Sequence, residues 1–244
     1  MNKSFTIAKR ELAGYFTTPL AYVFIVIFLA LMGAVTFYFG GFFNRGQADL
    51  AAFFSFHPWL YLFLIPSIGM RLWAEERKTG TIELLMTLPI STTQAVMGKF
   101  LASWAFAAIA LSLTFPIWIT VNYLGNPDNG VIVAGYVGSL LMAGAFLSIA
   151  CFVSALTRNQ VIAFVVAAAV CFMFMMSGLE MVQAAFKGWA PPFLTDLVAS
   201  MSFLTHFDGI MKGVIDIRDV IYLLSTMVVF LFANVVTIDI KKGG

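Results

Sequence analysis

The stretch Arg71-Leu-Trp-Ala-Glu-Glu-Arg-Lys-Thr-Gly-Thr-Ile-Glu-Leu-Leu-Met-Thr-Leu-Pro89 is a charged interruption between two long apolar segments. Five of the 26 charged residues, 14 basic and 12 acidic, lie between Glu75 and Glu83. The apolar segments on either side carry no charge. Because charged side chains are costly in lipid, the flanking segments are predicted to lie in a membrane and the interruption outside it.

The composition of the whole chain is typical of an integral membrane protein. Of 244 residues, 61% are hydrophobic and 11% are charged, against about 25% charged in soluble domains. A helix needs about 20 apolar residues to cross the hydrocarbon core, and six uncharged runs meet or approach that length. They are Leu20 to Phe43, Phe53 to Met70, Phe100 to Tyr123, Val131 to Thr157, Val161 to Leu179 and Val220 to Ile238.

These runs predict an all-α membrane protein with six transmembrane helices. Lipid cannot hydrogen-bond the backbone, so a span is a helix or a closed barrel, and the runs lack the alternation of a barrel strand. With the N-terminus inside, ten Lys and Arg residues lie on the cytoplasmic side and four outside. The positive-inside rule therefore places both termini in the cytoplasm.

Residues 1–19 are predicted to form an amphipathic helix at the membrane interface. Apolar residues recur at helical spacing while the charged residues, Glu11 among them, take the other side. The apolar positions are Phe5, Ala8, Leu12, Tyr15 and Phe16. The alternative is a positively charged anchor with no further role.

Residues 181–219 form the longest segment between predicted spans and are too apolar for a solvated linker. Two stretches of helical character, around Phe193 to Leu204 and Phe207 to Ile215, predict an extracytoplasmic helical hairpin. The hairpin either dips toward the bilayer or caps the bundle.

The charged interruption predicts a helix that emerges from the membrane and then breaks. Arg71 to Lys78 would extend the second span, and Gly80 would end the helix. Thr81 can cap a short new helix that Pro89 stops, and one face of it is apolar at positions i, i+3 and i+4. Those positions are Ile82, Leu85 and Met86. An exposed apolar face needs a partner protein, or else it lies on lipid headgroups.

Several sequence motifs of enzymes and transporters are missing, and their absence excludes some classes of function. The chain has no catalytic constellation, no metal-ligand cluster and no phosphate-binding G-x-x-x-x-G-K-[ST] loop. The predicted spans also lack the charged groups that ion-coupled transporters use, which disfavours a secondary transporter. We therefore expect no enzymatic activity and no nucleic-acid partner, and an energy source on a separate ATPase.

The run Glu75 to Pro89, followed by Val96-Met-Gly-Lys99, resembles the first cytoplasmic loop of type-2 ABC exporter permeases. The stretch Phe207 to Tyr222 resembles the last-span region of the gliding-motility-associated branch. The resemblance covers the whole chain as a single transmembrane domain, 1–244. It implies a multi-pass protein of the bacterial inner membrane that dimerises and couples to a cytoplasmic ABC ATPase, which binds ATP and Mg²⁺.

By this resemblance, residues 71–94 form the coupling loop. The implied ATPase-docking residues of its coupling helix are Thr81, Ile82, Glu83, Leu84, Leu85, Met86 and Leu88. The implied polar hinge consists of Arg71, Glu75, Glu76, Arg77 and Gly80, and the interfacial helix would contact the same ATPase through Phe5, Ala8, Leu12 and Phe16.

Several alternatives stay open. The chain is expected to be a permease subunit, but a membrane anchor or mechanical transmitter for an ATPase-driven envelope machine would carry the same loop. The dimer can contain identical or different protomers, and a periplasmic or membrane auxiliary subunit is a further possible partner. The residues do not specify the cargo.

Overall fold

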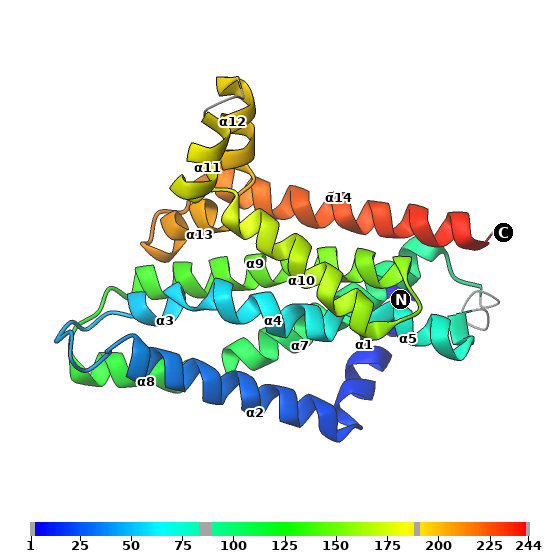
Figure 1. Ribbon diagram of the computed structural model, residues 1–244. Helices are drawn as coiled ribbons and strands as arrows, with labels where there is room; N and C mark the ends of the chain where they lie inside the picture. Colours follow the sequence, from blue (N-terminus) through cyan, green and yellow to red (C-terminus); the bar gives the residue numbers. More distant parts are fainter. Residues whose placement is uncertain (1–2, 83–88, 188–190, 243–244) are drawn as a thin grey trace.

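The computed structural model describes residues 3–82, 89–187 and 191–242, and within these it contains helices and no strand (Figure 1). This confirms the all-α prediction. The helices are α1 (Lys3–Phe16), α2 (Pro19–Ala34), η1 (Val35–Phe39), α3 (Ala51–Ser55), α4 (His57–Gly69), α5 (Arg71–Thr79), α7 (Thr92–Ser112), α8 (Phe115–Leu124), α9 (Asn129–Leu156), α10 (Gln160–Met176), α11 (Glu180–Lys187), α12 (Pro192–Ser200), α13 (Phe203–Met211) and α14 (Ile217–Lys242).

Four helical segments of the described chain are long and apolar enough to cross a membrane. They are Pro19–Phe39, Thr92–Leu124, Asn129–Leu156 and Ile217–Lys241, and each overlaps a predicted run. The other two predicted runs form shorter helices. Pro58 occupies the first turn of α4, which separates α4 from α3, and α10 has 17 residues. The six-span topology therefore stays a prediction.

The central helix of the bundle is α9, which contacts α4, α7, α10, α13 and α14. Small residues let its neighbours approach closely. A Cβ atom added to Gly69 of α4 would lie 2.4 Å from the Cβ atom of Ala150, and one added to Gly135 would lie 2.5 Å from the ring of Phe54. These glycines place α3 and α4 directly against α9.

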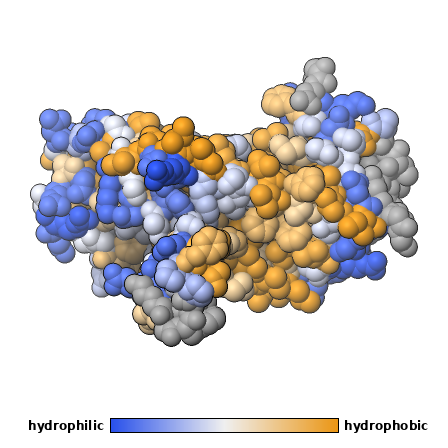
Figure 2. Space-filling model, turned by 90° about the horizontal axis from the view of Figure 1, so that it is seen from above, coloured by the Kyte–Doolittle hydropathy of each residue, from blue (hydrophilic) through white to orange (hydrophobic). Residues whose placement is uncertain are grey.

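The outer helices expose apolar side chains. Only 28% of the most apolar window in the first candidate span is buried, and 33% of that in the last, against 78% in α9. Figure 2 shows apolar side chains over much of the middle of one face, with hydrophilic side chains toward its ends. Such a surface is typical of helices that face lipid, and it agrees with an integral membrane protein.

In the segment between α10 and α14, α11 and α12 pack on each other and stand out from the bundle (Figure 1). The next helix, α13, returns and buries Phe203, Phe207 and Ile210. His206 Nδ1 lies 2.6 Å from an Asp219 carboxylate oxygen on α14. Thus α13 is held to the bundle by apolar and polar contacts.

Candidate functional site

The candidate site lies at the end of the bundle where α5 follows α4 and where α1 packs against α7 (Figure 1). The N- and C-termini lie toward the same end. The predicted coupling segment follows α5 directly, so the contacts that fix α5 determine what that segment is attached to.

Lys99 of α7 is the centre of this site. Its residue is 3% exposed, and its ammonium nitrogen lies 2.6 Å from Glu76 Oε1 and 3.5 Å from Glu11 Oε2. The same nitrogen lies 5.4 Å from the centre of the Trp73 ring, within the range of a cation–π contact. One buried cation thus joins α1, α5 and α7.

This cluster is expected to hold its geometry firmly. Moving a charge out of water is costly, and only well-placed partners offset the cost. Removing any one partner would leave another charge poorly solvated. The cluster therefore couples the position of α5 to that of α1.

Further contacts hold α1 along α7. The Tyr15 hydroxyl lies 2.8 Å from Ser103 Oγ, and burial raises the pKa of Tyr15 to about 12. A Cβ atom added to Gly98 would lie 2.6 Å from a methyl carbon of Ile7. The close approach at Gly98 brings Glu11 within reach of Lys99.

Ser154 of α9 occupies the junction between α4 and α5. Ser154 Oγ accepts from the Ala74 and Trp73 N–H groups, at 3.0 and 3.1 Å, and donates to the Met70 oxygen at 2.8 Å. These three hydrogen bonds hold the first turn of α5 against α9.

Two cations hold the C-terminal end of α9. Arg77 donates to the Ala155 carbonyl at 2.6 Å, and Lys241 donates to the Ala155 and Leu156 carbonyls at 3.0 Å. The last carbonyls of a helix lack intrahelical donors, and cations are favourable there. Burial, and then the charge of Arg158, lowers the pKa of Arg77. These contacts tie α5 and α14 to the same helix end.

The predicted polar hinge residues have different surroundings. Glu76 and Arg77 contact other helices, whereas Arg71 pairs with Glu75 on α5 itself at 2.8 Å. The hydrogen bond to Glu75 raises the pKa of Arg71. Gly80 ends α5 with a φ of 75°, a backbone conformation that glycine adopts without strain. The hinge role stays a prediction.

Of the predicted docking residues, the structure describes Thr81 and Ile82. The Thr81 hydroxyl lies 3.0 Å from that of Thr79, and Ile82 packs in part against the core. The remaining predicted docking residues, Glu83, Leu84, Leu85, Met86 and Leu88, lie outside the described residues.

The predicted interfacial residues divide between surface and interior. Ala8 is buried, Leu12 and Phe16 pack partly against the core, and Phe5 is 65% exposed. Glu11 lies between the exposed charges of α1 and the interior. One of its carboxylate oxygens lies 3.2 Å from the exposed Arg10, and the other lies 3.5 Å from Lys99 of α7.

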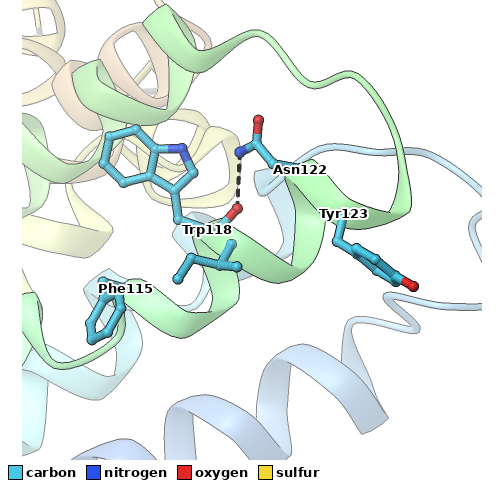
Figure 3. A pocket seen from close by; sticks show the side chains of 5 residues that line it. Phe115, Trp118, Asn122 and Tyr123 are labelled. Carbon is cyan, nitrogen blue, oxygen red and sulfur yellow. Dashed lines mark hydrogen bonds between the residues drawn. The ribbon is translucent and has the colours of Figure 1, made fainter.

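A pocket of about 470 Å³ on α8 offers less chemistry (Figure 3). Its lining residues are Phe115, Trp118, Ile119, Asn122 and Tyr123, and the Asn122 amide donates to the Trp118 carbonyl of its own helix. No charged side chain lines it. Within the described residues, no group of three or more His, Cys, Asp or Glu side chains could hold a metal ion.

Sequence reasoning missed Lys99, Glu11 and Ser154 as site residues. One signal was available, because Lys99 is the single charged residue between Glu83 and Asp128. A charge this isolated, beside a predicted span, needs a specific partner. No comparable signal marks Ser154, whose role depends on how α9 packs against α4 and α5.

The model of the family described as ABC-2 family transporter protein matches residues 5–238. The chain belongs to the ABC-2 transporter family. A search of curated proteins found no match. The family match spans nearly the whole chain, including every residue of the Lys99 cluster.

Membership identifies this ABC-2 family chain as an integral membrane protein of a transport system. The family is one of transport subunits, which are generally not enzymes and which work with an ATPase. The match does not resolve branches within the family, so the gliding-motility branch stays a prediction.

Proposed function

We propose that this chain is the permease subunit of a bacterial inner-membrane ABC exporter, with six spans and both termini in the cytoplasm. In this topology, α3 and α4 form the second span and α10 the fifth. Two protomers would associate and couple to two copies of a separate ATPase, which binds ATP and Mg²⁺. The supporting facts are the family match and the four long apolar helices.

The observation that carries the proposal is the anchoring of α5. This helix leads into the predicted coupling segment, and its Glu76 contacts the cation that also binds Glu11 of α1. Arg77 and the Ser154 junction join the same helix to α9. A force applied beyond Gly80 would therefore reach α1, α7 and α9 through short polar contacts.

The docking face is proposed to consist of Ile82, Leu85 and Met86. We expect Leu85→Asp to abolish ATPase binding, since a charge at the centre of an apolar contact must lose its water on docking. The permease and its ATPase partner would be co-expressed and purified together. The retained ATPase and its rate of ATP hydrolysis in liposomes would then be measured.

Thr87→Asp is the matched control, because it adds the same charge two residues away and off the apolar face. It should retain most of the assembly. Full assembly and activity in Leu85→Asp would contradict the docking proposal. A coupled complex whose vesicles move no candidate cargo would instead favour a mechanical transmitter.

A further inference from the structure

An apolar groove of about 410 Å³ lies between α1, α7 and α9. On α1 it is lined by Phe5, Ala8, Lys9 and Leu12, which share one face of the helix. This volume lies within the range of about 300–1,000 Å³ that is usual for ligand sites. The groove is large enough to hold part of an elongated apolar molecule.

The side chains of α7 that line the groove are apolar, or have their polar atom already hydrogen-bonded. Ala105 and Ala108 leave the depression, and Trp104 forms a wall. The indole N–H of Trp104 donates to the Leu140 carbonyl at 2.9 Å, so its polar atom is already paired. An occupant of the groove therefore meets almost only apolar surface.

Membrane placement points to a lipid as the occupant. The α7 residues of the groove lie within the candidate span Thr92–Leu124, where the surroundings are acyl chains. The α1 side of the groove carries one charge, the exposed Lys9, which makes no ion pair with any described residue. The groove thus joins an apolar slot to a cation, which complements a lipid with an anionic headgroup.

We propose that this groove binds one acyl chain of an anionic phospholipid, with Lys9 contacting the headgroup phosphate. The bound lipid packs against the face of α1 next to Glu11. It thereby stabilises the position in which α1 packs against α7. The groove shares Phe5, Ala8 and Leu12 with the predicted ATPase contacts of α1, but lipid binding to the chain alone does not depend on the ATPase.

Phosphatidylglycerol with brominated acyl chains tests the proposal, because bromine quenches nearby tryptophan fluorescence. The full chain would be placed in phosphatidylcholine nanodiscs, and the Trp104 signal obtained as the difference between wild type and Trp104→Phe. We expect phosphatidylglycerol to quench at a concentration about five-fold lower than phosphatidylcholine with the same chains, the effect of one nearby lysine.

Lys9→Gln should remove this preference, and Ala105→Leu should fill the groove and remove the saturable quenching by both lipids. Lys78→Gln, the same charge change at an exposed position of α5, and Ala169→Leu, the same enlargement on exposed α10, should behave as wild type. Native mass spectrometry would count the phosphatidylglycerol retained by each variant, independently of the fluorescence.

Equal quenching by the two lipids, or a preference that survives Lys9→Gln, would overturn the anionic site. So would an Ala105→Leu variant that retains the lipid. The absence of Trp104 quenching by either lipid would show that protein covers the groove, and would overturn the proposal as well.

Discussion

The helices α5 and α12 have nine residues each, and their burial is opposite to their composition. Charged and polar residues dominate α5, yet Leu72, Trp73 and Ala74 are at most 4% exposed. The apolar helix α12 buries only Thr195, and its Phe193 is 72% exposed.

This difference shows that the overall hydropathy of a short helix does not decide whether it is anchored. Lys99 of α7 offers a cation to α5, and α9 offers the Ser154 hydroxyl and the Ala155 carbonyl. In contrast, α12 packs mainly on α11, so its apolar residues stay available to lipid or to another protein. We expect α5 to transmit force and α12 to tolerate change.

The largest effect is expected from Lys99→Met, which leaves two carboxylates without their cation. Breaking a buried ion pair costs about 3–5 kcal/mol, so the Tm of the purified protein should fall by about 10 °C. Lys78→Met, on the exposed side of α5, is the control and should leave the Tm nearly unchanged. A similar small effect in both variants would show that the Lys99 ion pairs do not anchor α5, and would contradict the difference drawn between α5 and α12.

A smaller effect is expected from Ser154→Ala. The substitution leaves the Trp73 and Ala74 N–H groups without their acceptor, at a cost of about 1–3 kcal/mol. Ser148→Ala is the matched control, because that buried hydroxyl donates only to the Ala145 carbonyl of its own helix. Thermal unfolding should separate the two variants. Equal Tm values would show that Ser154 does not anchor α5.

The smallest effect is expected from Phe193→Ala on α12, within about 0.5 kcal/mol, as for other exposed positions. Phe203→Ala, on the adjacent helix, should cost about 3–5 kcal/mol because that ring is fully buried. The free energies of unfolding of both variants, measured in the same detergent, would show where the anchored helices end and the projecting helices begin. A large loss in Phe193→Ala would show that α12 has a buried contact.

Much of the architecture could be predicted from residue patterns alone. The uncharged runs predict membrane helices, since no other local structure satisfies the backbone in lipid. The family resemblance first noted in the run Glu75 to Pro89 is confirmed by the match over residues 5–238. For the second and fifth runs, run length did not predict the break before Pro58 or the 17-residue length of α10.

The site could be predicted only in part. Glu76 and Arg77 were singled out by their place in the charged interruption, but their partners were not. Lys99 lies 23 residues after Glu76, and nothing in that separation indicates that the two side chains form a salt bridge. The partner of Arg77 is the backbone carbonyl of Ala155. Every residue has a carbonyl, so the side chains in the sequence do not indicate which one Arg77 binds.

The sequence by itself determined that this chain is helical, lies in a membrane and belongs to a transport family. Those properties follow from hydrophobicity and local pattern, which each segment carries alone. Only the tertiary structure decided that Glu11, Glu76 and Lys99 meet, and that Ser154 bonds to the backbone at the junction of α4 and α5. These contacts depend on the close approach of helices far apart in the chain, at glycines such as Gly69 and Gly98.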